Sequence, residues 1–110
     1  MFYKQTPQGY KPVLNGIDLK TLVYGEKTLF SEFRMKAGSQ LPRHAHPQEQ
    51  TGYLVAGRIR LTIGNETFEP EPGDSWCVPG SMEHQAEILV DSVAIEVFSP
   101  VGEDYLPDAQ

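Results

Sequence analysis

The chain has 110 residues, 39% of them hydrophobic, which is the size and composition of one compact domain. Its formal net charge is −6, and its nine Lys and Arg residues are scattered along the chain, which argues against binding to a nucleic-acid backbone. No apolar run approaches the roughly 18 residues of a membrane span, and the single cysteine, Cys77, excludes an intrachain disulfide.

Short apolar or alternating segments follow one another along the chain, bounded by Gly, Pro, Asn and Asp, and none keeps a helical period. This pattern predicts an all-β fold. In chain order, the predicted strands are 19–24, 29–36, 51–56, 58–63, 66–69, 75–78, 85–90 and 93–98. Strands of this number and length fit a double-sheet jelly-roll barrel.

The segment 58–63 shows the alternation most clearly, because Ile and Leu occupy every second position and polar residues lie between them. One face of that strand is therefore predicted to lie in the core. Gly64 and Asn65 then predict a tight turn into the strand 66–69. We expect one domain over residues 1–110, with its core from about 16 to 106.

All three histidines of the chain take part in one spacing pattern. His44 and His46 are two residues apart, so on a strand both imidazoles would project from the same face, with Cα atoms roughly 6 to 7 Å apart. Gln50 returns to that face if the strand continues, although Pro47 could introduce a bulge. His84 must arrive from a separate strand. The pattern predicts one divalent metal ion bound by these three histidines and Gln50, with open positions for water or substrate.

Glu49 is a rival ligand because it is charged and adjacent, but strand parity favours Gln50. The alternative without a metal leaves the three histidines as surface or packed residues. With three imidazoles and one amide as ligands, the ion would keep its full +2 charge and act as a strong Lewis acid. Imidazole suits Zn, Fe, Ni and Cu alike, and Mn stays open, so the ligand types leave the metal undecided.

The same residues resemble the paired motifs of the cupin family, G-x5-H-x-H-x3-E-x6-G and G-x5-P-x-G-x2-H-x3-N. The first motif is matched by Gly38, His44, His46, Gln50 and Gly57, and the second by Gly73, Pro79 and His84. Gln50 stands where the family has Glu, Gly80 and Ser81 occupy the x-G positions, and Ile88 replaces Asn. The resemblance implies the cupin double-stranded β-helix, an all-β jelly-roll barrel with a metal inside.

Two stretches, 44–50 and 97–106, also resemble the small cupins of the KdgF type, which act in pectin and alginate catabolism. The resemblance covers about 16 to 106. It implies that His, His, Gln and His hold a metal ion, and that the protein opens the ring of a 4,5-unsaturated uronate to its linear ketone form.

In a local alignment with that group, only some of the group's pocket residues are matched in this chain. Glu96 stands where the group has Asp, Phe98 matches its pocket Phe, and Gly102 replaces its Arg. A guanidinium would pair with the substrate carboxylate. Because Gly102 lacks that group, Arg34 or Arg60 would have to bind the substrate instead. Arg43 is a weaker candidate.

Glu96 is also a candidate from the pattern alone. Ala94, Glu96 and Phe98 share a strand face opposite three apolar residues, and a carboxylate that points into a barrel is costly without a partner or a function. Near a metal ion it could transfer a proton as general acid or base. The alternative is that this face is exposed to solvent. Trp76 and Phe33 are interpreted as packing residues.

These observations predict a cytoplasmic, metal-dependent enzyme for a small oxygenated molecule, such as an anionic sugar acid or an enol, with Glu96 as its proton carrier. A homodimer is expected because a chain this short buries only about two-thirds of its unfolded surface. One alternative is a cupin dioxygenase in which three histidines hold Fe(II). Another is a binding or sensing module in which the metal anchors an acid without turnover.

Overall fold

The computed structural model describes residues 1–102, and within them every regular element is a strand. The all-β prediction is therefore confirmed. No helix among these residues is long and apolar enough to cross a membrane. The strands are β1 (Lys11–Leu14), β2 (Ile17–Tyr24), β3 (Leu29–Met35), β4 (Gln40–His44), β5 (Glu49–Ile63), β6 (Glu66–Phe68), β7 (Ser75–Val78) and β8 (His84–Ser99).

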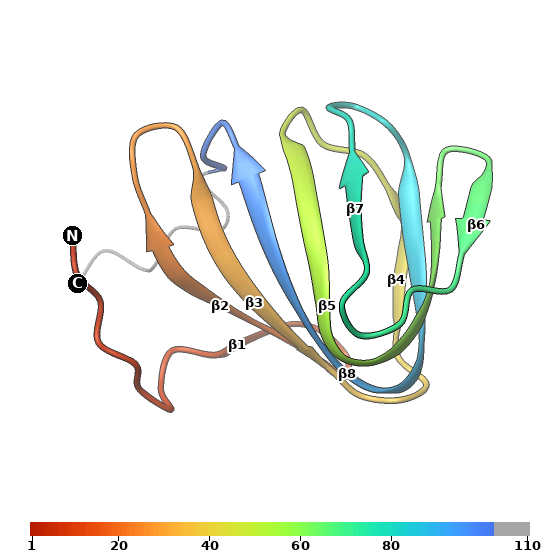
Figure 1. Cartoon of the computed structure of the whole chain (residues 1–110), viewed down its shortest axis with the longest axis horizontal. Helices are drawn as coiled ribbons and strands as arrows, with labels where there is room; N and C mark the ends of the chain where they lie inside the picture. The colour runs from red at the N-terminus through yellow and green to blue at the C-terminus, as the bar shows by residue number, and fades with distance from the viewer. Residues whose placement is uncertain (103–110) are drawn as a thin grey trace.

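The strands form one antiparallel sheet in the order β1-β2-β3-β8-β5-β6, with β4 paired to β8 and β7 paired to β5. β5 and β8 pair with each other along almost their whole length. Both strands bend sharply near their middle, so the sheet folds over into two facing walls (Figure 1). One wall contains β2, β3, β7 and the second half of β8, and the other contains β4, β6 and the first half of β8. The jelly-roll barrel is formed in this way.

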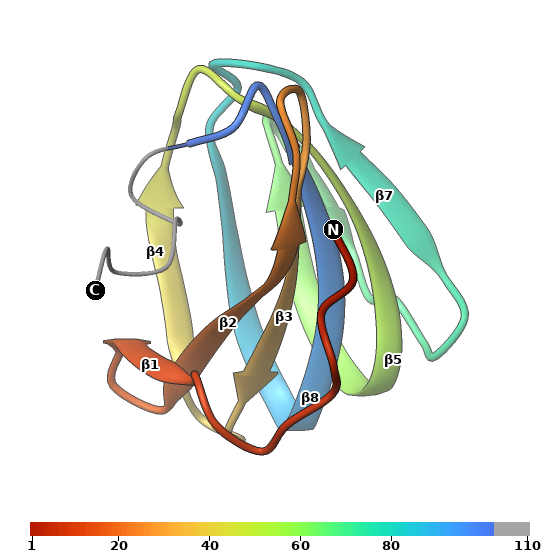
Figure 2. The ribbon, with the colours of Figure 1, turned by 90° about the vertical axis from the view of Figure 1, so that its left-hand side faces the viewer.

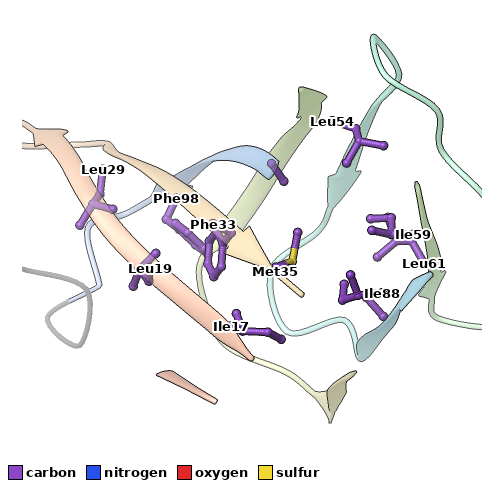
Figure 3. Packing of buried hydrophobic residues seen from close by; sticks show 12 residues of the cluster. Ile17, Leu19, Leu29, Phe33, Met35, Leu54, Ile59, Leu61, Ile88 and Phe98 are labelled. Carbon is purple, nitrogen blue, oxygen red and sulfur yellow. The ribbon is translucent and has the colours of Figure 1, made fainter. Parts of the chain in front are cut away.

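The core lies between the two walls, and its apolar side chains come from both of them (Figure 3). The strand alternation predicted within 58–63 holds, because Ile59 and Leu61 are buried. Gly64 and Asn65 connect β5 to β6 as predicted. This two-sided core fixes the inward direction of every second residue on β5 and β8, and it therefore decides which side chains reach the interior.

The sequence prediction divided β5 and β8 into two strands each and did not include β1 or β4. Gly57 and the pair Asp91 and Ser92 were interpreted as strand breaks, whereas they are the places where two continuous strands bend. Ser92 fastens the bend, since its Oγ accepts a hydrogen bond from the backbone N–H of Arg58 at 3.1 Å. The predicted tail beyond residue 102, including the stretch to Leu106, lies outside the described residues.

Gly57 is expected to be the glycine whose replacement destabilises the fold most clearly. Its φ is +98°, and an added Cβ would lie 2.1 Å from Oγ of Ser92 and 2.5 Å from the carbonyl oxygen of Asp91. Gly73 is a matched control, because it has the same φ and no atom near an added Cβ. We expect Gly73→Ala to lower the free energy of unfolding by about 1 to 2 kcal/mol from backbone strain. Gly57→Ala should lose about 1 to 3 kcal/mol more from the clash. Urea denaturation measures both, and equal losses would contradict the role given to the bend.

The first ten residues run along the outside of the barrel (Figure 2), where they contact one residue of β2 and one of β3. The ammonium group of Lys20 donates to the carbonyl oxygen of Thr6 at 2.7 Å. The guanidinium of Arg34 lies 4.1 Å from the centre of the Tyr10 ring, a cation–π distance. These contacts fasten the N-terminal segment to the outer face of the sheet.

Candidate metal centre

The three histidines approach one another from two strands and from a connection between strands. His44 ends β4, His46 lies in the connection between β4 and β5, and His84 begins β8. His44 and His84 are also direct cross-strand partners. The prediction that His44 and His46 share one strand is wrong, because β4 ends at His44 and the chain turns before β5 begins.

The imidazoles nevertheless lie close to one another. One ligand nitrogen from each of the three rings lies within 4.8 Å of the other two. The ring centroids are 4.2 Å apart for His44 and His84, 4.9 Å for His46 and His84, and 5.7 Å for His44 and His46. Two nitrogens bound to one ion at about 2.0 to 2.1 Å lie at most about 4.2 Å apart, so the three nitrogens are close to the spacing that a shared ion requires.

Backbone carbonyls select the tautomer of all three rings. Nδ1 of His44 lies 2.7 Å from the carbonyl oxygen of Pro42, that of His46 3.1 Å from Gln48, and that of His84 3.0 Å from Met82. A carbonyl oxygen only accepts, so Nδ1 must carry the hydrogen and the neutral ring keeps its lone pair on Nε2. The same second hydrogen bond orients histidine ligands in known metal sites.

Gln50, the second residue of β5, is buried and turns its amide oxygen towards the histidines. Its Nε2 donates to Oε1 of Glu96, which leaves Oε1 of Gln50 3.0 Å from Nε2 of His46. With Nδ1 of His46 carrying the hydrogen, both of these facing atoms present lone pairs. Two atoms bound at right angles to one ion about 2.1 Å away lie about 3 Å apart, so a shared cation accounts for the contact. Glu49, the rival ligand, is exposed and lies near Cys77.

His84 adds a second sign that the residues fit a metal ion. Among the buried side-chain nitrogen and oxygen atoms of residues 1–102, Nε2 of His84 is the one that has no hydrogen-bond partner. A buried polar atom without a partner costs about 1 to 3 kcal/mol and calls for an explanation. Burial, followed by the neighbouring His44, His46 and Arg43, lowers the pKa of His84 and so favours the neutral ring that binds metals.

Glu96 lies on the interior face of β8, with only 6% of its surface exposed, so the alternative of a solvent-exposed face is wrong. Its Oε1 accepts hydrogen bonds from Nε2 of Gln50 and, at 3.3 Å, from Nε1 of Trp76. Burial raises the pKa of Glu96 to about 7, although the two hydrogen bonds act in the opposite direction. Phe98 lies two residues further along the same face, with its ring centroid 5.8 Å from that of His46.

A cavity of about 50 Å³, which we call the histidine cavity, is lined by most of these groups. Its polar lining includes His44, Gln50, His84 and Glu96, and its apolar lining includes Phe98. The volume exceeds the roughly 10 to 15 Å³ that one water needs. Because His44 is exposed, a molecule larger than the cavity would reach it from the side of that ring.

The candidate substrate-binding arginines are not brought to the histidine cavity. Arg34 lies on the outer face, where it pairs with Glu32 at 2.8 Å and packs on Tyr10. Arg60 pairs with Glu69 and Glu87 at 3.3 and 3.1 Å. Arg43 binds Glu83 at 2.9 Å and the carbonyl oxygen of Gly64. In the described part of the chain, the lining of the histidine cavity contains no Lys or Arg.

Trp76 has a polar contact that the sequence interpretation missed, because it was assigned to packing alone. Its indole N–H reaches Glu96 across Gly52 of the intervening strand. The available signal was the glycine itself, since a glycine inside a predicted strand often marks the close approach of another group.

Residues 31–99 match the family model described as a cupin domain. Two curated relatives match in sequence: the uncharacterised protein SCO3923 of Streptomyces coelicolor, 30% identical over 62% of this chain, and the uncharacterised protein MJ1618 of Methanocaldococcus jannaschii, 33% identical over 57%. The matches cover 66% and 51% of those proteins, so the chain spans between half and two-thirds of their length.

Solved structures match over a larger part of the chain. KdgF from a Halomonas species superposes with a TM-score of 0.90 and 27% identity, over 96% of this chain and 98% of that one. An RmlC-like cupin from Shewanella frigidimarina gives a TM-score of 0.90 at 22% identity, over 96% of both chains. Salicylate 1,2-dioxygenase from Pseudoaminobacter salicylatoxidans gives 0.75 at 17%, over 80% of this chain and 27% of that one. The last two likenesses concern the fold alone.

Proposed function

The chain belongs to the cupin domain family, and from that premise we propose that it is a metal-dependent enzyme that opens the ring of a 4,5-unsaturated uronate. His44, His46, His84 and the amide oxygen of Gln50 would hold one divalent ion. That ion would supply Lewis-acid polarisation of a substrate oxygen. Zn, Fe, Ni, Mn and Cu all stay open as its identity. The fold and the three converging histidines support a metal cupin, and the likeness to KdgF supports the choice of substrate.

The observation that carries the proposal is the buried carboxylate of Glu96 beside the histidines. Ring opening of such a uronate breaks the bond between C1 and the ring oxygen, removes the proton from the C1 hydroxyl, and adds a proton at C4, while C1 and C5 become carbonyls. The reaction is an isomerisation, so one group that takes up a proton and returns it is sufficient. Glu96 is proposed as that group, because it lines the same cavity as His44 and His84.

The remaining lining of the histidine cavity supports a role in orientation and in the exclusion of water. Phe98 packs against His46 and would cover one side of a bound ring. Since no Lys or Arg among the described residues lines the cavity, the substrate carboxylate would be neutralised by the bound dication. Arg43, with its guanidinium already bound to Glu83, would act only at long range. The homodimer and the cytoplasmic location stay predictions.

The test is ring opening of a 4,5-unsaturated galacturonate in D₂O, followed by NMR through the loss of the vinylic H4 signal. Metal-loaded protein is expected to accelerate the reaction and to deliver deuterium to one face of C4, because a fixed carboxyl group protonates from one side. Protein stripped with a chelator is the control. With it, the reaction should keep its spontaneous rate and deliver deuterium to both faces of C4. An unchanged rate with loaded protein would refute the uronate assignment.

A dioxygenase is the second candidate, favoured by three imidazole nitrogens that converge without a carboxylate among them. It predicts oxygen consumption by the Fe(II)-loaded protein in the presence of an oxidisable substrate. The uronate reaction consumes none, so an oxygen electrode separates the two. Saturable binding without turnover in either assay would instead favour a binding module.

A further inference from the structure

Three residues lie in a row across three neighbouring strands. Gly52 of β5 is directly opposite Trp76 of β7 on one side and directly opposite Glu96 of β8 on the other. The indole N–H of Trp76 donates to Oε1 of Glu96 at 3.3 Å, so the ring must extend over the middle strand. The contact therefore depends on the residue in the middle of the row.

Gly52 makes this contact geometrically feasible. A Cβ at this position would lie 2.3 Å from both Nε1 and Cε2 of the indole, a distance that real Cβ atoms essentially never show. Gly52 is not among the glycines with positive φ, so its backbone conformation does not require glycine. Glycine inside a strand costs about 0.5 to 1 kcal/mol relative to alanine. The space for the indole is what explains its presence here.

The row continues towards the metal site through Glu96. The oxygen of Glu96 that accepts from Trp76 also accepts from Nε2 of Gln50. That bond turns the amide nitrogen of Gln50 away from the histidines and leaves its Oε1 3.0 Å from Nε2 of His46. The two ends of an amide are almost equal in size, so without this bond a flipped amide would present N–H groups to the ion, which repel a cation.

We propose that Trp76 is a positioning residue that holds Glu96 in place, so that Glu96 fixes the amide of Gln50 with its oxygen towards the three histidines. Gly52 is the residue that admits the indole. The inference rests on the proposed function for the assignment of Gln50 as a ligand and of Glu96 as the proton carrier. It adds that one hydrogen-bonded series, from Trp76 to Glu96 to Gln50, orients both groups, and we call this series the positioning row.

The first test measures the dissociation constant of metal-free protein for Zn²⁺ by competition with a chromophoric chelator. Trp76→Phe keeps an aromatic ring but removes the N–H, and is expected to weaken Zn²⁺ binding about tenfold, as loss of a partner that orients a metal ligand does. Gly52→Ala keeps the indole but displaces it, and is expected to weaken binding to the same extent. The double variant should be no weaker than either single variant, because both remove the same interaction.

Phe33→Leu is the matched control, because Phe33 lines the same cavity and has no hydrogen-bonding group. Its Zn²⁺ affinity is expected to stay within twofold of that of the unmodified protein. Unchanged affinity in Trp76→Phe would overturn the inference, and so would an equal loss in the Phe33→Leu control, since packing alone would then explain the effect.

A second measurement does not depend on the metal. Trp76 is the single tryptophan of the chain, so its indole N–H gives one cross-peak in a ¹H–¹⁵N spectrum. In the unmodified protein this peak is expected downfield and slow to exchange with D₂O, as for a donor bound to a buried carboxylate. In Gly52→Ala it should move upfield and exchange at least tenfold faster. An identical peak in both proteins would contradict the role of Gly52.

Ring-opening kinetics separate a failure of this inference from a failure of the proposed function. If the unmodified protein does not accelerate ring opening but Zn²⁺ affinity falls in Trp76→Phe, the substrate is wrong and the positioning row stands. If ring opening is catalysed and Zn²⁺ affinity does not change, the row is wrong and the function stands. If both hold, Trp76→Phe at saturating metal is expected to lower kcat about tenfold with KM within twofold, because proton transfer is disturbed and substrate binding is not.

Discussion

Replacing His84 with leucine is expected to weaken metal binding by about 100-fold or more, while the metal-free protein stays about as stable as before. Four ligands share a binding free energy that reaches about 10 to 16 kcal/mol in zinc sites, so one ligand contributes roughly 3 kcal/mol. The stability expectation follows from Nε2 of His84, which is buried without a hydrogen-bond partner. Leucine removes that desolvated atom but also the bond from Nδ1 to the carbonyl oxygen of Met82. The two effects should cancel to within about 1 kcal/mol.

Thermal unfolding with and without metal measures both parts of this prediction. In the unmodified protein, metal at 100 times its dissociation constant should stabilise the fold by about 2.7 kcal/mol. In His84→Leu that gain should disappear, whereas the control Met35→Leu, also in the wall of the histidine cavity, should keep it. A His84→Leu protein that still gains stability from metal would show that the ion is held elsewhere.

The short strands between turn residues were predictable from the sequence, and the two bends were not. β2, β3 and β7 appear within one or two residues of the predicted bounds, because each is a short run between turn residues. Gly57 of β5 is a residue type common in turns, but here it lies inside a continuous strand. That strand bends at this residue, and its partner β8 bends beside it. A bend of two paired strands depends on contacts 34 residues apart, such as the one between Arg58 and Ser92, which a local pattern does not contain.

Strand parity explains both the success and the failure of the site interpretation. Parity along β8 assigned Glu96 to the face shared with Ala94 and Phe98, and all three are buried. The same rule could have excluded Arg34, because it lies between the buried residues Phe33 and Met35 of β3 and must therefore point outward. His46 was assigned to a strand by spacing, yet it reaches the site from a loop. Spacing indicates that residues are close, but not which element brings them together.

The second large effect is expected for Glu96→Gln, which should lower kcat for ring opening by about 10²- to 10⁴-fold, the usual contribution of one general acid or base. The amide oxygen of the new glutamine can still accept from Gln50 and Trp76, so the positioning row survives while the proton carrier is lost. Zn²⁺ affinity is therefore expected within about threefold of that of the unmodified protein, which distinguishes this variant from Trp76→Phe.

Glu87→Gln is the control for Glu96→Gln, because Glu87 lies on the same strand but pairs with Arg60 outside the histidine cavity. It removes the same negative charge from β8, so its kcat should stay within twofold if position, and not net charge, matters. Deuterium delivery to C4 gives a further readout: the residual reaction of Glu96→Gln should lose its facial preference, since solvent then protonates C4 from either side. A Glu96→Gln protein with full kcat and one-sided delivery would require a different proton carrier. In that case, the buried carboxyl would serve only to hold Gln50.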